Sequence, residues 1–368
     1  MRRPVTTSRP LPNATVETGT AVEFADEPFM ESRRQGHDID STTGPISDTV
    51  ARTMTNLDLL TAADVQLMQG LAQRVTATHP HLVNAEATYG ELAWNWGKSH
   101  AAHGATWPRR LWFAGGRLVA WGWAQLPHRV FRSDGRSKDV TNANLVYQIH
   151  PDHADLIDEI IEWYGQVAAG LERTVVPTAA DELALKQWAA HGYETDPSSL
   201  GDTGFWTQLN QRDLVDVAEP VLPPGFRFRT ADEAGPEAAV RAHVDAWAPS
   251  TFTAEGFQGV RQTAGYRGDL HLLVEAPDST MASSTIMWLD EVNRTAEFEP
   301  VGTHPGFRRQ GLARAMLLYG MRRVRSLGAT HATVACLGAP GHPRARGLYH
   351  SVGFREISRD APLVSRQA

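Results

Sequence analysis

The chain has 368 residues, which is enough for two domains of ordinary size. Its hydrophobic content of 42% and charged content of 21% are typical of a soluble globular protein, and no apolar run is long enough to span a bilayer. The formal net charge of −7 excludes a general attraction to nucleic acid or to an anionic membrane, although a local basic patch could exist. Cys336 is the single cysteine, which excludes an intrachain disulfide and a multi-cysteine metal site.

Residues 1–53 are rich in Thr, Ser, Pro, Arg and Asp and show neither helical nor strand periodicity. We predict a mobile N-terminal extension there. Alternatively, Met54 is the true start, because an amphipathic helix is predicted soon after it, over 61–76. No hydrophobic stretch follows Met1, so a secretory signal is not expected, and the lone cysteine fits a reducing cytoplasm.

The next part of the chain predicts an N-terminal module over 54–215. Apolar segments on either side of Gly115 and Gly116 predict a β-hairpin, with strands over 111–114 and 118–123. The pattern predicts further strands over 143–149, 174–176 and 205–209 and helices over 152–169 and 181–191.

A C-terminal module over 223–368 repeats this order of elements, after a proline-rich linker at 211–224. We expect strands over 270–276, 283–289, 295–303 and 332–336 and helices over 311–327 and 344–352. Such an order predicts an α/β fold of two tandem modules, each a mixed sheet flanked by helices.

Two local matches support the repeat. His150-Pro151 ends the third strand of the N-terminal module, as His304-Pro305 ends that of the C-terminal module. Trp188 stands four residues before Gly192, as Tyr349 stands four residues before Gly353.

The strongest chemical signal is a strand, loop and helix over 298–318. Small residues in the loop allow a backbone to approach a ligand closely. Free amides at the helix start, together with its dipole, favour a pyrophosphate, and two arginines add positive charge. The loop residues are Arg308, Arg309, Gln310, Gly311, Leu312 and Ala313.

This segment resembles the acetyl-CoA signature of the GNAT acetyltransferases, [Gln or Arg]-x-x-Gly-x-[Gly or Ala], at Arg308, Gly311 and Ala313. Downstream, Ala345-x-x-Leu348-Tyr349-x-x-x-Gly353-Phe354 resembles the fourth-helix motif of that family. The resemblance covers about 223–359 and, more loosely, the N-terminal module. It implies two GNAT-like modules with splayed sheets, and acetyl-CoA as co-substrate.

The resemblance also implies roles for single residues. The backbone of Val301, Gly302 and Thr303 would hold the pantetheine arm and polarise the thioester carbonyl. Tyr349 would be the general acid that protonates the departing thiolate, since a phenol is protonated at neutral pH; packing is its alternative role. The family often has an Asn where this chain has His342, which puts one pantetheine contact in doubt.

The amine acceptor must lose a proton, and two glutamates are candidates for the base. Glu297 and Glu299 alternate along the third strand and should point to one face of the sheet. Glu297 falls where the histone acetyltransferase branch has its catalytic glutamate, whereas Glu299, which we favour, lies nearer to the acetyl group. Either could instead be a solvated strand residue. His304 is a further candidate, and a covalent route through Cys336 is conceivable, although a structural histidine and an inert buried thiol are the simpler interpretations.

The N-terminal module lacks this chemistry. Alignment on the His-Pro pairs puts Ile157 at the position of Gly311, Glu159 at that of Ala313 and Trp188 at that of Tyr349. We therefore predict a structural module, or one wall of the acceptor cleft. A degenerate module before an active one resembles mycothiol synthase and its tandem relatives in architecture.

These observations predict an acetyl-CoA-dependent N-acetyltransferase whose acceptor is the primary amine of a small molecule, such as an amino sugar, an antibiotic or a metabolite. The alternatives are a peptide or protein N-acetyltransferase, a non-catalytic acyl-CoA sensor and a purely structural protein. We expect neither nucleic acid nor membrane as a partner, and no metal site.

Overall fold

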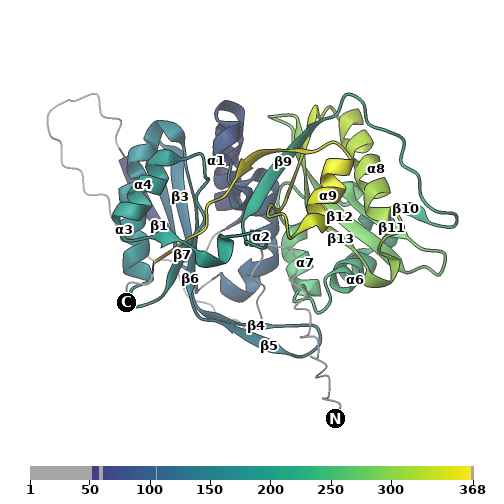
Figure 1. Ribbon diagram of the computed structural model, residues 1–368, viewed down its shortest axis with the longest axis horizontal. Helices are drawn as coiled ribbons and strands as arrows, with labels where there is room; N and C mark the ends of the chain where they lie inside the picture. The colour runs from purple at the N-terminus through teal and green to yellow at the C-terminus, as the bar shows by residue number, and fades with distance from the viewer. Residues whose placement is uncertain (1–51, 58–60, 105, 366–368) are drawn as a thin grey trace, which may run out of the picture.

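The computed structural model describes residues 52–57, 61–104 and 106–365. Two mixed sheets of seven strands lie side by side, each with helices against it (Figure 1). This confirms the predicted α/β class with two tandem modules. Most of the predicted N-terminal extension lies outside the described residues, but its last two residues, Arg52 and Thr53, already belong to a strand. No helix in the described part of the chain is long and apolar enough to cross a membrane.

The first sheet has the strand order β1-β2-β3-β6-β7-β16-β8. Its strands from the N-terminal module are β1 (Arg52–Leu57), β2 (Arg109–Ala114), β3 (Arg117–Gln125), β6 (Ala143–Ile149), β7 (Arg173–Val175) and β8 (Glu194–Thr195). The helices of this module are α1 (Ala62–Thr78), α2 (Tyr89–His103), α3 (Ile157–Val167) and α4 (Glu182–Ala190). A separate hairpin of β4 (His128–Phe131) and β5 (Ser137–Val140) extends from it.

The second sheet has the order β10-β11-β12-β13-β14-β9-β15. Its strands from the C-terminal module are β10 (Arg227–Thr230), β11 (His271–Glu275), β12 (Met281–Asp290), β13 (Thr295–Thr303), β14 (His331–Leu337) and β15 (Arg355–Arg359). The helices here are α5 (Ala231–Ala234), α6 (Pro236–Ala246), α7 (Ala254–Arg261), α8 (Leu312–Ser326) and α9 (Pro343–Ser351).

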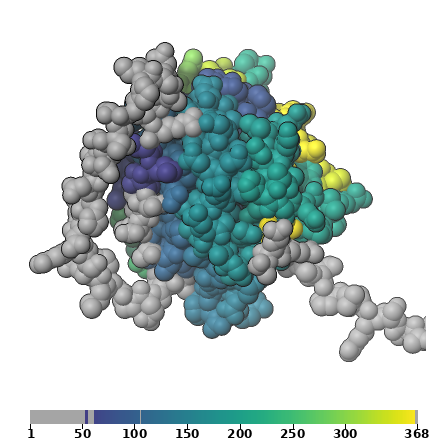
Figure 2. All heavy atoms as spheres, turned by 90° about the vertical axis from the view of Figure 1, so that its left-hand side faces the viewer, coloured from purple at the N-terminus to yellow at the C-terminus, as the bar shows by residue number. Residues whose placement is uncertain are grey.

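The last strand of each module lies in the sheet of the other. β9 (Thr207–Asp213) pairs with β14 and β15, and β16 (Leu363–Ser365) pairs with β7 and β8. In Figure 1 the yellow C-terminal segment crosses to the first sheet, and Figure 2 shows yellow residues at the N-terminal face of the molecule. The predicted closing strand at 205–209 was therefore wrong in its bounds and its sheet, and residues 211–213 of the predicted linker are strand. β9 and β16 occupy equivalent positions in the two sheets, so the modules exchange their last strands.

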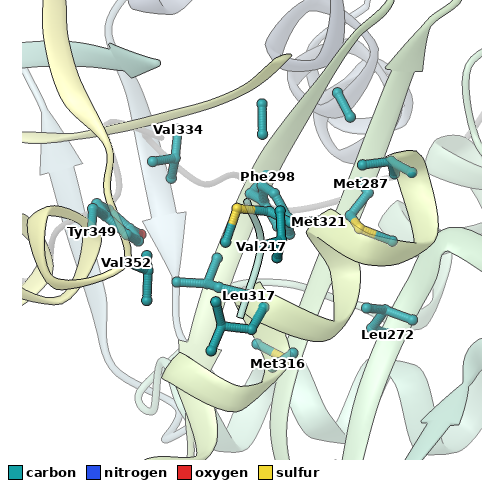
Figure 3. Close-up of a cluster of buried hydrophobic side chains, with 14 of the residues drawn as sticks. Val217, Leu272, Met287, Phe298, Met316, Leu317, Met321, Val334, Tyr349 and Val352 are labelled. Carbon is teal, nitrogen blue, oxygen red and sulfur yellow. The ribbon is translucent and has the colours of Figure 1, made fainter. Parts of the chain in front are cut away.

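The core of the C-terminal module forms between the second sheet and α8. The buried stripe of α8 includes Met316, Leu317 and Met321, which pack on Phe298 of β13 and Met287 of β12 (Figure 3). This periodicity is why the sequence predicted the helix to within one residue at each end. Close packing between the buried faces of β13 and α8 holds the strand against the helix that follows it.

Helix α2 joins the modules and was not predicted. It begins at the N-cap Thr88, whose side chain accepts from the amide of Glu91. It packs closely against α7, because Gly97 and Gly259 leave no room for a Cβ between the two backbones. It also contacts β13. A helix of the N-terminal module thus reaches the strand that precedes the predicted acetyl-CoA loop.

Candidate functional site

The second sheet is split between β13 and β14. The two strands pair in parallel only as far as Glu297 and Thr333, although they continue to Thr303 and Leu337. Residues 298–303 therefore have no strand beside them on that edge. The splayed sheet that the family resemblance implied is present in this module.

The backbone along the split keeps donors available. His304 donates to the carbonyl of Ala282 at 3.0 Å, so the alternation of an antiparallel ladder turns the amides of Val301 and Thr303 away from β12 and toward the split. Gly302 lies directly against the Trp247 ring, where a Cβ would clash. The stretch proposed to hold a pantetheine thus offers free amides on a backbone fixed from the other side.

The loop between β13 and α8 has the conformation of an anion site. Arg309 and Gly311 both have positive φ, 68° and 81°, and Gly311 is the N-cap of α8. A Cβ at Gly311 would meet nothing within 4 Å, so the glycine is needed for its left-handed backbone and the space beside it is open. The amides at the start of a helix have no intrahelical acceptor, and with the helix dipole they favour a phosphate.

The side chains of this loop divide into two groups. Arg308 holds the loop in place, since its guanidinium donates to the carbonyls of Thr303 and Ala246 at 3.1 Å each. Arg309 and Gln310 are exposed, and Leu312 is buried in the core below. Ala313 is partly buried. Arg308 therefore supplies structure as well as charge, a role that the sequence pattern did not indicate.

Tyr349 lies at the inner end of the split. It is 5% exposed and packs beside Val334 and Val352 (Figure 3). Burial, together with the nearby Cys336 and Glu299, raises the pKa of its phenol well above the ordinary value, so that the hydroxyl stays protonated. Cys336 is also buried, which raises the pKa of its thiol to about 11. A protonated thiol is a poor nucleophile, so the geometry gives no support to a covalent route.

Glu297 and Glu299 both face helix α2. Glu297 is 5% exposed, and its carboxylate accepts from Thr88 Oγ1 at 2.6 Å and from the amide of Gly90 at 2.9 Å. Burial raises the pKa of Glu297 to about 7, and these hydrogen bonds oppose the rise. Both oxygens of Glu297 are therefore bound to groups of the N-terminal module.

Glu299 occupies an irregular point of β13. Glu299 and Pro300 together oppose Ile286 alone, which is a β-bulge, and the peptide bond between them is cis. Trp288 Nε1 donates to the carbonyl of Glu299 at 2.7 Å. Burial first, and then the charges of Glu91 and Glu297, raise the pKa of Glu299 well above the ordinary value, whereas Lys98 lowers it.

Four charged side chains cluster here: Glu297 and Glu299 of β13, and Glu91 and Lys98 of α2. The sequence predicted only the first two. Glu91 is 6% exposed, and Asn95 Nδ2 donates to its carboxylate at 2.6 Å. The sequence Thr88-x-x-Glu91 has the form of a helix N-cap and could have revealed the start of α2. Nothing in the sequence links that helix to β13, which lies some two hundred residues further along the chain.

His304 has a structural role in the geometry. Its Nδ1 accepts from the amide of Gly306 at 3.0 Å and caps the short turn after β13. His150 makes the same contact with the amide of Asp152 at 3.3 Å in the other module. Within the described ranges, no group of three or more His, Cys, Asp and Glu side chains is placed to hold a metal ion.

The equivalent split in the N-terminal module is bridged by a hydrogen bond between its own side chains. β6 and β7 pair from Ala143 to Leu145, and a pocket follows beside Tyr147 and Gln148. Trp188 Nε1 donates to the hydroxyl of Tyr147 at 3.1 Å, so the residue at the place of Tyr349 is bound to the strand it faces. A 3-10 helix (Pro151–Leu156) runs directly into α3. The predicted helix at 152–169 thus begins later than expected, and no left-handed loop precedes it.

Comparison with known proteins agrees with this geometry. Residues 239–354 match the model of the acetyltransferase (GNAT) family. Among curated protein sequences, none matches this chain.

Solved structures show the same fold over most of the chain. A tandem GNAT protein from the clavulanic acid biosynthesis pathway superimposes with a TM-score of 0.57 at 15% identity, covering 85% of this chain and 98% of that one. A GCN5-related N-acetyltransferase from Sphaerobacter thermophilus gives 0.52 at 16% identity, covering 85% and 95%. A GNAT-family acetyltransferase from Colwellia psychrerythraea gives 0.51 at 11%, covering 85% and 100%.

The fold is therefore that of a tandem GNAT protein. Residues 239–354 are a GNAT acetyltransferase domain, and the protein is an acyltransferase that takes its acyl group from an acyl-CoA.

Proposed function

We propose that this protein transfers the acetyl group of acetyl-CoA to the primary amine of a small molecule, in the C-terminal module alone. The observation that carries the proposal is the position of Glu299 and Tyr349. They come from β13 and α9 and lie close enough for the charge of Glu299 to raise the pKa of Tyr349. The proposed base and the proposed acid thus lie near the inner end of the split whose outer end is the loop before α8.

In this proposal the donor lies along the split. The pyrophosphate binds the amides that follow Arg309, and the pantetheine binds the amides of Val301 and Thr303. Charge-assisted hydrogen bonds of this kind contribute about 1.5–3 kcal/mol each. The thioester carbonyl then receives hydrogen bonds from a backbone that is already fixed, which favours the developing oxyanion.

The reaction is a direct transfer. Glu299 takes a proton from the acceptor ammonium, the amine nitrogen attacks the thioester carbon, and a C–N bond forms as the C–S bond breaks. Tyr349 gives its phenolic proton to the departing thiolate, and the second proton that the nitrogen loses as the amide forms restores the phenol. Holding both substrates in one cleft supplies much of the rate. The raised pKa of Tyr349 suits a group that must stay protonated until the thiolate forms.

Two features favour a small cationic acceptor over a protein. Glu299 lies beside the carboxyl groups of Glu91 and Glu297, which attract an ammonium group when they are ionised. Helix α2 packs on α7 and on β13, so the N-terminal module bounds the space in front of Glu299. A bounded acidic site suits a compact amine, whereas a protein lysine would need an open groove.

The test is a calorimetric titration of acetyl-CoA into the full-length protein, followed by a thiol-release screen across amines. We expect one binding site per chain and turnover with at least one small amine. Binding without turnover, with any amine or peptide, would indicate an acyl-CoA sensor. Two sites would show that the N-terminal module also binds the donor, and absence of binding would overturn the proposal.

A further inference from the structure

We propose that Glu297 is a positioning residue, which fixes helix α2 of the N-terminal module on the catalytic strand and affects the reaction only through Glu299. This inference rests on the proposed function, since it concerns the base of that reaction. It separates the roles of two glutamates that stand two residues apart on β13.

Hydrogen bonds from the N-terminal module occupy both carboxylate oxygens of Glu297. One carboxylate oxygen accepts from Thr88 Oγ1 at 2.6 Å, and the other accepts from the amide of Gly90 at 2.9 Å. Thr88 Oγ1 in turn accepts from the amide of Glu91 at 3.2 Å. Glu297 thus extends the N-cap of α2 and lies at the positive end of its dipole.

This geometry does not suit a base. The backbone of α2 lies directly over the carboxylate, since a Cβ on Gly90 would come within 2.7 Å of Glu297 Oε2 and 2.6 Å of the Trp288 ring. A base must reach the proton it removes within about 2.6–3.2 Å. Glu299 lies two residues further along β13, where the strand no longer pairs with β14.

The same contact places the groups that surround Glu299. Helix α2 carries Glu91 and Lys98, β13 carries Glu297, and α9 carries Tyr349; these are the titratable groups whose charges act on Glu299 or respond to it. Asn95 orients Glu91 within the helix. If α2 shifts on β13, the charges around Glu299 shift with it. The N-terminal module therefore affects catalysis although it carries no acetyl-CoA loop.

The experiment compares three variants of the full-length protein by steady-state kinetics over pH. Thr88→Val removes one donor to Glu297 and keeps the shape of the side chain. Glu297→Gln keeps an acceptor but removes the charge. We expect each to lower kcat/KM about tenfold, and the double variant to lose no more than the worse single one, because both changes break the same contact. In Glu297→Gln the acidic limb of the pH profile should move to lower pH, since a negative charge beside Glu299 is lost.

Thr61→Val is the matched control. Thr61 is the N-cap of α1 and accepts from the amide of Asp64 in the same way, but it is exposed, so its loss should leave the kinetics unchanged. A loss of a thousandfold or more in Glu297→Gln, with the acidic limb abolished and Thr88→Val near wild type, would make Glu297 the base and overturn the proposal.

Thermal unfolding of the same variants tests the contact without any substrate. The decreases in Tm for Thr88→Val and Glu297→Gln should not add in the double variant, whereas Thr61→Val and Glu297→Gln should add. Additive decreases for the first pair would overturn the contact itself. If no amine is acetylated, the proposed function fails and the positioning role fails with it, while these Tm values still decide whether the contact joins the modules.

Discussion

The split between β13 and β14 and its counterpart between β6 and β7 have the same strand order and precede the same His-Pro pair, yet they differ wherever the chemistry requires a particular residue. Ala143 and Leu145 stand where Glu297 and Glu299 stand, by alignment on the histidines. Both are buried apolar residues of the N-terminal core. The strand that carries two carboxylates in one module is thus a plain core strand in the other.

The comparison separates the split itself from the loop that we propose for the donor. The N-terminal split even contains a pocket, beside Tyr147 and Gln148. What it lacks is the left-handed loop, because its chain coils from His150 straight into α3. The amides in these turns are already bonded: His153 donates to the carbonyl of His150 at 2.8 Å, and Ile157 donates to the carbonyl of Ala154. The two modules therefore differ in a few backbone dihedrals before the helix, and we expect phosphate binding to depend on these.

Substitution of the loop glycine should have the largest effect. Gly311→Glu forces a side chain onto a backbone with φ of 81° and puts a negative charge where we propose that the pyrophosphate binds. We expect acetyl-CoA affinity to fall by at least about 100-fold, which corresponds to about 2.8 kcal/mol, the loss of one or two charge-assisted hydrogen bonds. Calorimetric titration measures it.

Gly116→Glu is the control for that change. Gly116 lies in the turn between β2 and β3 with φ of 75°, and a Cβ there would also meet nothing within 4 Å. Gly116→Glu therefore introduces the same backbone strain and the same charge, but away from the split. Equal loss of affinity in both variants, or wild-type affinity in Gly311→Glu, would remove the case for a phosphate site at α8.

The two residues at the inner ends of the splits give the next largest contrast. Tyr349→Phe removes only the hydroxyl, so kcat should fall about 100-fold or more while the Kd for acetyl-CoA stays nearly unchanged. Trp188→Phe, at the equivalent place, removes the hydrogen bond to Tyr147 and shrinks a fully buried ring, so it should lower Tm but leave kcat unchanged. A Tyr349→Phe enzyme with wild-type kcat would show that this phenol only packs.

The sequence predicted those elements whose own periodicity or turn residues define them. The strand at Thr295–Thr303 and the helix at Leu312–Ser326 are fully or nearly as expected, because each has a continuous apolar pattern and a clear end. The loop signature and Tyr349 were found by resemblance on short motifs. Alternation predicted that Glu297 and Glu299 point to one face of the sheet, and in the structure both interact with residues of α2.

What could not be predicted depends on long-range contacts. No local pattern says that β9 joins the sheet of the C-terminal module, since a short strand fits either edge. The β-bulge opposite Ile286 and the contact of Thr88 with Glu297 are equally non-local. The choice between the two glutamates required the three-dimensional position of α2, which carries no apolar stripe as regular as that of α8.

The pH profile should distinguish the active strand from its apolar counterpart. Burial and two neighbouring carboxylates raise the pKa of Glu299, and a base works only when ionised. The acidic limb of kcat/KM should therefore lie well above the ordinary range of a glutamate, with about a tenfold loss per pH unit below it. Two amines of different pKa identify the source, because a limb that belongs to the enzyme does not move with the amine. Glu299→Gln should abolish it, and a limb near pH 4 would contradict the assignment.

The smallest expected effect is on stability, and it comes from Glu297, which stands at the position equivalent to Ala143 of the other module. Burial raises the pKa of Glu297 to about 7 in the folded protein. A raised pKa contributes stability that is complete below the unfolded value and is lost as pH rises through the folded value. The Tm advantage of the wild type over Glu297→Gln should therefore be larger at pH 5 than at pH 8, by a few degrees, for a difference of about 1–3 kcal/mol.

Glu275→Gln provides a contrast for the same measurement, because the pKa of Glu275 is lowered whereas that of Glu297 is raised. Glu275 is buried against Arg227 and Arg229, and these partners hold its pKa below the ordinary value. Its contribution is thus already complete above pH 5, and the Tm difference between wild type and Glu275→Gln should not change between pH 5 and pH 8. If Glu297→Gln behaves in the same pH-independent way, Glu297 ionises normally in the folded state. The hydrogen bonds from α2 would then stabilise its carboxylate at least as strongly as burial opposes it.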